Sequence, residues 1–381
     1  MTYQARSNVR STRTGVSSWL FALDPVLLLA ALALTAYGIF AVYIAGNDDS
    51  QAYAFNQSVG FVLGLAIAVP LALMDYRILQ RYLKHIYVAT IVILLAVMFF
   101  GFVAGGARSW IDVGPVQVQP SEFAKVLVIV VLAGYMIEHP INQNKNFVKS
   151  LALVAAPTLL VFLQPDLGTA LVFGAIFVTM AYIGGAKILQ LGVLAAAGAL
   201  MAYLAVKVGI LADYQVARLT AFLDQSGNND MGYQVAQSKM AIGSGGLTGK
   251  GLDATTLANL GFLPENRTDF IFSNLAERLG FAGAILLIFL FFVFTWRILH
   301  IATVSRDRFG VLLAVGVGTM FLFHVFVNIG MTMGIMPVTG IPLPFISYGR
   351  SSLVVSVISL GLLQSIAIRS RIEYGKHPNP A

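Results

Sequence analysis

Long apolar runs separated by polar segments occupy most of this chain. The runs are unbroken rather than alternating, and most approach the ~20 residues that an α-helix needs to cross a bilayer. Because the bilayer core offers no water to backbone polar groups, such segments cross it as helices. We expect about ten spans, with these approximate bounds: 25–44, 56–74, 86–103, 120–137, 149–163, 169–183, 188–206, 281–300, 309–334 and 353–368.

The composition supports this pattern. Hydrophobic residues make up 58% of the chain and charged residues only 11%, whereas soluble domains carry about 25% charged residues. The absence of cysteine excludes disulfides and thiolate metal sites. The sequence therefore predicts an all-α integral membrane protein whose membrane domain, 19–369, holds all the spans.

The basic residues predict how the spans are oriented. Lys and Arg follow every even-numbered span: Arg77, Arg81, Lys84, Lys145, Lys149, Lys187, Arg297, Arg306, Arg308, Arg369, Arg371 and Lys376. Connections rich in Lys and Arg stay in the cytoplasm, so we expect a basic cytoplasmic tail at 1–18 and a second one at 370–381. We attribute the net charge of +7 to these connections and expect no nucleic-acid partner.

The connection between the seventh and eighth spans, 210–278, is predicted to be a large extracytoplasmic loop. Loops of this length are usually functional. Apolar residues recur every three or four positions in 214–223 and 233–242, which predicts short amphipathic helices on the membrane surface. The glycine-rich segment 243–251 suits either a flexible hinge or a weak anion site that includes Lys250.

Charged residues gather where this loop meets the eighth span. Asp269 directly precedes an apolar segment that includes Phe270 and Phe272. A carboxylate in such a place is costly unless it is paired, and Arg267 or Lys125 could pair with it. The alternative is that Asp269 only caps a helix.

Three further ionisable residues lie on the same outer side. Glu122 and Lys125, at the start of the fourth span, share one helix face and can pair; they form either a salt bridge at the membrane edge or part of a functional cavity. Arg108, beside Trp110, is either a phosphate ligand or an interfacial anchor. His324, in the middle of a span, is predicted to be a packing histidine, and no cluster has metal-ligand spacing.

Several motifs in this order resemble the SEDS family, which contains RodA, FtsW and SpoVE. They lie at 106–111, 119–125, 164–169, 237–246, 263–272 and 337–349. The resemblance covers the whole membrane region and is closer to elongation-type RodA than to division-type FtsW. The chain departs from the family pattern at Arg267, Arg278 and Arg350.

The resemblance implies a peptidoglycan glycosyltransferase that polymerises lipid II into β-1,4 glycan strands at the outer face of the bacterial cytoplasmic membrane. Asp269 would be the catalytic base of an inverting transfer. The substrate-binding residues would be Arg108, Glu122, Lys125, Lys239, Arg267 and Ser347. Whether a divalent cation, Mg²⁺ or Mn²⁺, assists the reaction stays open.

The resemblance also implies partners. We expect a class B penicillin-binding protein, a transpeptidase whose single helix packs near 281–300 and 309–334, and other membrane proteins of the elongation complex. A flippase or transporter of the lipid-linked precursor, a division-type role and an inactive scaffold are the alternatives. A flippase needs polar residues along a route through both leaflets, whereas the polar residues here gather on one side.

Overall fold

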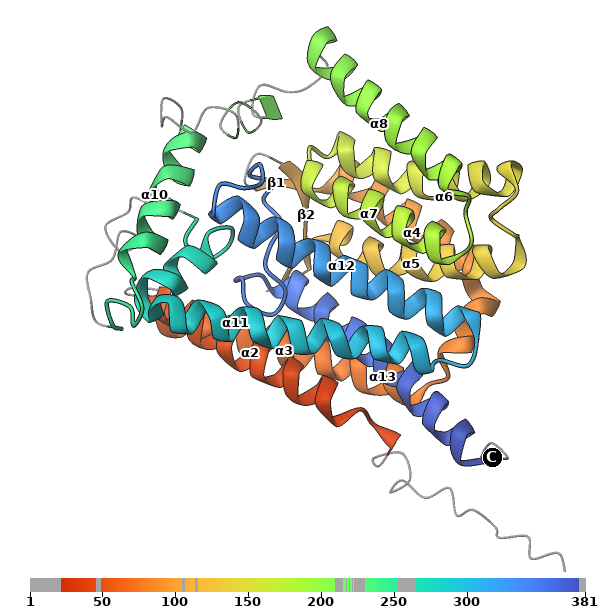
Figure 1. Cartoon of the computed structure of the whole chain (residues 1–381), viewed down its shortest axis with the longest axis horizontal. Coiled ribbons are helices and arrows are strands. Elements are labelled where there is room, and N and C mark those ends of the chain that lie inside the picture. Colours follow the sequence, from red (N-terminus) through yellow and green to blue (C-terminus); the bar gives the residue numbers. More distant parts are fainter. Residues whose placement is uncertain are drawn as a thin grey trace, which may run out of the picture.

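The computed structural model describes residues 22–45, 49–104, 107–113, 116–209, 230–252 and 265–376, together with Gln215, Val216, Arg218, Thr220 and Phe222. Figure 1 shows a bundle of long helices. Its helices are α2 (Pro25–Ala45), α3 (Ser50–Leu73), η2 (Tyr76–Tyr82), α4 (Leu83–Phe100), α5 (Pro120–Glu138), α6 (Asn144–Leu163), α7 (Leu167–Ile183), α8 (Ile188–Val208), α10 (Asp230–Ser244), α11 (Ile271–Val304), α12 (Arg308–Thr332) and α13 (Arg350–Lys376).

The ten predicted spans correspond one by one to ten of these helices, and η2 and α10 lie outside the set. Among the described residues, nine helices are long and apolar enough to cross a membrane, and α7 is an apolar helix of 17 residues. The fifth span was predicted to be short, but α6 has 20 residues. The prediction of an all-α membrane protein with about ten spans is confirmed.

Hydrogen bonds and ion pairs between distant segments divide the connections into two groups. One group shares the end of the bundle that carries α10, which we call the α10 end: Arg267 bonds to Ala45, Gln119 to Ser351 and Ser238 to Thr332. The other group shares the opposite end: Arg297 bonds to Asp24, Arg77 to Asp307 and Arg369 to Leu73. The connections therefore alternate between two ends, as the basic residues predicted.

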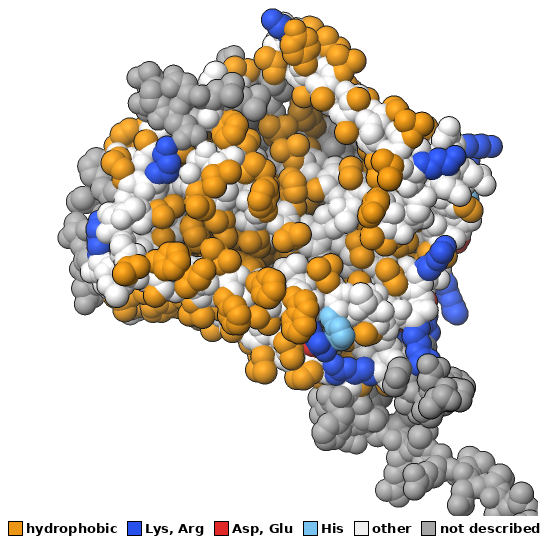
Figure 2. Space-filling view, viewed as in Figure 1, with side chains coloured by type: hydrophobic (Ala, Val, Ile, Leu, Met, Phe, Trp, Pro, Cys, Tyr) orange, Lys and Arg blue, Asp and Glu red, His pale blue; other side chains and the backbone are white. Residues whose placement is uncertain are grey.

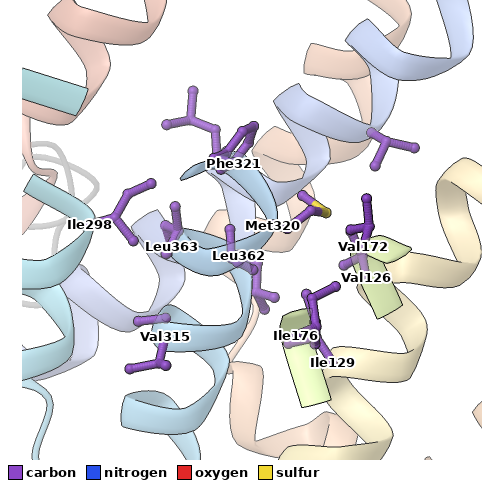
Figure 3. Packing of buried hydrophobic residues seen from close by; sticks show 14 of the residues in the cluster. Val126, Ile129, Val172, Ile176, Ile298, Val315, Met320, Phe321, Leu362 and Leu363 are labelled. Carbon is purple, nitrogen blue, oxygen red and sulfur yellow. The ribbon is translucent and has the colours of Figure 1, made fainter. Parts of the chain in front are cut away.

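The core lies between α5, α7, α11, α12 and α13, whose side chains interdigitate in Figure 3. Three buried aromatic rings extend it toward the α10 end: Phe294, Phe321 and Phe345 stack or meet edge-on at centroid distances of 5.1–5.6 Å. By contrast, α8 has no buried residue, and it runs along the outside of the bundle in Figure 1. Helix α8 therefore contributes no buried residue to the core of the bundle.

A small sheet, which the sequence analysis did not anticipate, precedes α5. Strands β1 (Phe102–Ala104), β2 (Ala107–Val113) and β3 (Val116–Val118) pair in antiparallel order. The missed signal was a Gly-Gly pair and a Gly-Pro pair on either side of seven residues rich in strand formers. The sheet brings 107–118 close to the start of α5 at the α10 end.

The glycine-rich segment packs into a break in α11. Gly280 has φ 67° and ψ −164°, so α11 consists of two helices joined at this residue. A Cβ at Gly280 would overlap the backbone nitrogen of Gly249, and Phe281 N donates to Gly246 O at 2.9 Å. The Lys250 ammonium pairs with a carboxylate of the same helix at 2.6 Å. The glycine-rich segment therefore packs against the break in α11 and bonds to it. Because the Lys250 ammonium is already paired, an anion site on Lys250 is not supported.

Arg278, one of the departures from the family pattern, serves the same junction. Its Nε donates to Asn274 Oδ1 at 3.1 Å and its Nη1 donates to the carbonyl of Leu252. The side chain is buried at 3% exposure. Its contacts give it a structural role at the end of the glycine-rich segment.

Candidate active site

Asp269 lies in a turn that immediately precedes α11. Phe270 N donates to Glu265 O at 3.0 Å and closes the turn. From α12, the Asn328 amide donates to the carbonyl of Asp269 at 3.1 Å and to that of Ile341 at 2.8 Å. Asp269 is half-buried, and its backbone is held between two segments far apart in the sequence.

Arg218 is the cation that faces this carboxylate. Its Nη1 donates to Thr339 O at 2.9 Å. A Cβ placed on Gly340 would lie 3.5 Å from Arg218 Nη2 and 3.6 Å from Asp269 Oδ2, so both charged groups border this glycine. The sequence suggested Arg267 or Lys125 as the partner, but Lys125 is paired with Glu122, and the charge that lowers the pKa of Asp269 is that of Arg218.

The surroundings of Asp269 make its carboxyl group a better base. The pKa of Asp269 is raised to about 6: burial is the largest cause, the charge of Glu265 adds to it, and the charge of Arg218 opposes both. Glu265 is held in place by the Thr268 hydroxyl, which donates to Oε2 at 2.7 Å. The carboxyl group is therefore largely ionised at neutral pH and still able to accept a proton.

The motif at 337–349 forms a cradle behind Asp269. The Ser347 hydroxyl donates to Thr268 O at 2.6 Å and accepts from Leu343 N at 2.8 Å. The Gln57 amide donates to Ser347 O at 3.0 Å. Ser347 is buried at 3% exposure, so its hydroxyl ties the cradle to the Asp269 turn instead of lining an open surface.

Arg267 is directed toward α3. Its guanidinium lies 4.2 Å from the ring centroid of Tyr53, and its Nε donates to Ala45 O at 3.2 Å. Its own carbonyl accepts from Tyr348 N at 2.9 Å. Arg267 thus joins the Asp269 turn to the connection between α2 and α3.

A second charged cluster lies within the bundle. Lys125 Nζ donates to Glu122 Oε1 at 2.6 Å and lies 2.9 Å from His324 Nε2. His324 Nδ1 lies 2.6 Å from Met320 O. Since a carbonyl only accepts and an ammonium only donates, the hydrogen-bond network assigns a neutral imidazole protonated on Nδ1. The predicted pair of Glu122 and Lys125 is confirmed as a salt bridge.

The sequence did not connect His324 with this pair, and its interpretation as a packing histidine missed the contact. Lys125 is 1% exposed, Glu122 and His324 are 3% exposed, and a space of about 10 Å³ adjoins them, roughly room for one water. The cluster is therefore closed in this conformation.

The two remaining predicted residues lie near the α10 end. Arg108 belongs to β2, where it pairs with Val103. Lys239 is exposed on α10, which the Ser238 hydroxyl anchors to Ser273 at 2.5 Å. In the part of the chain that the structure describes, no three His, Cys, Asp or Glu residues gather as a metal site.

Comparison with known proteins places this chain in a family. The cell cycle protein family of FtsW, RodA and SpoVE matches residues 22–372. The peptidoglycan glycosyltransferase MrdB of Escherichia coli K12 is 38% identical over 348 residues, which cover 90% of this chain and 93% of MrdB.

Solved structures agree with this. A peptidoglycan synthase complex that coordinates polymerization and crosslinking contains a chain with a TM-score of 0.80 and 30% identity, covering 92% of this chain and 98% of that one. The rod shape determining protein RodA of Thermus thermophilus has a TM-score of 0.69 and 29% identity, covering 91% and 97%. The chain described here therefore belongs to the FtsW/RodA/SpoVE family.

Proposed function

We propose that this chain is a peptidoglycan glycosyltransferase that polymerises lipid II. The observation that carries the proposal is the half-buried Asp269 carboxyl group at the α10 end, with its pKa raised to about 6 and Arg218 facing it. Family membership supports the same reaction, since MrdB is named a peptidoglycan glycosyltransferase.

In the proposed reaction, Asp269 accepts the proton of a sugar hydroxyl, the 4-hydroxyl of GlcNAc, as this oxygen attacks the anomeric carbon of the donor. The bond to undecaprenyl pyrophosphate breaks in the same step, and the configuration inverts. A base and cationic groups are the two requirements of this chemistry. Arg218, Lys239 and Arg108 are the cations that we assign to the departing pyrophosphate.

The buried residues among the predicted substrate ligands do not contact the substrate in this proposal. Glu122 and Lys125 are closed against His324, and Ser347 is bonded on both sides. We assign these three residues to positioning, because each holds a segment next to Asp269 or to the cradle behind it. A divalent cation enters no step of this scheme.

For the orientation, we propose that the α10 end faces outward and that both chain termini are cytoplasmic. The support is the concentration of Lys and Arg in the connections at the opposite end. A cysteine at Asn144 should react with an impermeant thiol reagent only after permeabilisation. One at Asn228, which lies outside the described residues, should react in intact cells.

As a partner, we propose a class B penicillin-binding protein working in elongation. The similar synthase complex couples polymerization to crosslinking. The partner helix was expected near the eighth and ninth spans; α11 presents Phe281, Phe289 and Phe292 at 58–65% exposure, whereas α12 is mostly buried. We therefore place the partner on α11.

The direct test uses purified protein reconstituted with lipid II, with and without the partner, and separates glycan products by length. Polymer should form and should depend on Asp269. If no polymer forms in either preparation, while lipid II crosses the membrane of vesicles that contain the protein, a flippase becomes the better explanation.

A further inference from the structure

A pocket of about 420 Å³ opens at the opposite end of the bundle, far along α11 from the Asp269 turn. It lies where the ends of α11 and α13 meet the residue before α2. Its polar lining is Asp24, Arg297, His300, Arg306, Ser370 and Arg371. None of these residues takes part in the reaction proposed above, so the pocket requires a separate explanation.

The floor of the pocket is a rigid ionic frame. Arg297 donates to both oxygens of Asp24, from Nε at 2.8 Å and from Nη2 at 2.6 Å, and Arg371 Nη2 donates to Oδ2 at 2.9 Å. Asp24 N donates to Gln364 Oε1 at 2.8 Å. Burial alone would raise the pKa of Asp24, but the two arginines hold it below its usual value. The guanidinium groups are therefore fixed in place before any ligand arrives.

The charge of the lining favours an anion. Three arginines and one carboxylate line the pocket, which leaves two positive charges, and His300 adds a further hydrogen-bonding group. Arg306 is exposed at the rim. Guanidinium groups suit phosphate because their planar N–H groups match its oxygens. A phosphate or phosphodiester is thus the ligand chemistry that the lining recognises.

The rest of the pocket is apolar and meets the outer surface of the bundle. Ile301, Val304 and Ala367 complete the lining, and Trp296 and Leu299 are about half exposed on α11. Figure 2 shows basic side chains and a histidine at the border of the hydrophobic surface, near the end where the chain terminates. An apolar wall beside a phosphate-binding floor suits a lipid better than a soluble ion.

We infer that this pocket binds the phosphodiester headgroup of an anionic phospholipid, with the acyl chains lying along α11. Basic pockets between helices at the cytoplasmic face bind such headgroups. The inference rests on the proposed orientation, which places this end in the cytoplasmic leaflet, and it is independent of the glycosyl transfer.

The test compares Arg306→Gln with Arg308→Gln, an exposed arginine at the start of α12 that does not line the pocket. Both variants leave the Asp24 frame intact. Native mass spectrometry and thermal stability are measured in detergent with added phosphatidylglycerol, phosphatidylcholine, glycerol phosphate or inorganic phosphate. No lipid II is present, so the outcome does not depend on the polymerase activity.

We expect phosphatidylglycerol, and not phosphatidylcholine, to be retained and to stabilise the protein. Binding should weaken about fivefold in Arg306→Gln, since one basic residue contributes roughly that factor, and should weaken further when His300→Gln is added. Arg308→Gln should bind like wild type. Equal binding by the two arginine variants would overturn the inference. Equal stabilisation by glycerol phosphate or inorganic phosphate would also overturn it, because the ligand would then be soluble.

Discussion

The Asp269 carboxylate and the Lys125 ammonium both lie in the α10 half of the bundle, but they differ in how accessible they are to a substrate. Asp269 is half-buried, borders Gly340 and shares that border with Arg218. Lys125 is 1% exposed, and its ammonium is taken by Glu122 and His324. A base must reach the proton that it removes, so in this conformation only the first group can act on a substrate.

One helix supports both groups. Asn328 holds the Asp269 backbone, and His324 lies one turn earlier on α12 and holds Lys125. The closed cluster thus fixes the helix on which the open site depends. The difference between them predicts two kinds of loss on mutation: loss of chemistry with normal folding at Asp269, and loss of folding stability at Lys125.

The largest expected effect is that of Asp269→Asn. The amide keeps the size of the side chain but cannot accept the proton, so the polymerisation rate should fall by roughly 10²–10⁴. Thermal stability and lipid II binding should change little. Glu265→Gln, a change of the same kind four residues away, is the control and should stay close to wild type at neutral pH. An Asp269→Asn protein that polymerised lipid II at the wild-type rate would remove Asp269 from its role as the base.

The next effect is on stability, in Lys125→Met. The change leaves the Glu122 carboxylate buried without its cation, and breaking such pairs costs about 3–5 kcal/mol. The melting temperature should therefore fall markedly. Glu122→Gln added to Lys125→Met should restore much of it, because no charge then stays unpaired. If Lys125→Met folded as stably as wild type and lost only activity, Lys125 would have to reach the substrate, and the comparison would fail.

The sequence predicted the parts of this molecule that depend on local pattern. The period and length of the apolar runs defined the spans, and the i,i+3 spacing of Glu122 and Lys125 predicted their salt bridge. The helix expected at 233–242 is present within α10. The helix expected at 214–223 lies only partly within the described residues, of which Arg218 is one.

The parts that were missed depend on contacts between distant segments. Arg218 and Asp269 border the same glycine, Gly340, although the two residues lie far apart in the sequence, and His324 lies 199 residues from Lys125. Nothing in a local window of sequence identifies such partners. The break at Gly280 was hidden for the same reason, because the segment that fills it lies about thirty residues upstream.

A smaller effect is expected from Gly340→Ala. Gly340 has φ +75°, and a side chain in that conformation costs about 1–2 kcal/mol. The added methyl group would lie in ordinary van der Waals contact with Arg218 and Asp269, at 3.5–3.6 Å, so the cost comes from the backbone and the melting temperature should fall. Gly192→Ala is the control, because a Cβ at that position in α8 meets nothing within 4 Å and should be neutral or slightly stabilising. Equal effects at the two glycines would contradict a backbone cost at the positive φ of Gly340.

The smallest expected effect is a shift in the dependence of the polymerisation rate on pH. It tests whether Asp269, and not the buried Lys125 cluster, is the group that titrates. Because the pKa of Asp269 is raised to about 6 and only the ionised carboxylate is a base, the rate should fall as the pH drops through about 6. Glu265→Gln removes a negative charge that raises this pKa, so the midpoint should move to lower pH. Arg218→Gln removes a positive charge that lowers it, so the midpoint should move to higher pH. These opposite shifts, measured as rate against pH in reconstituted protein, would identify Asp269 as the titrating group; a midpoint that neither substitution moves would assign the titration to a group elsewhere.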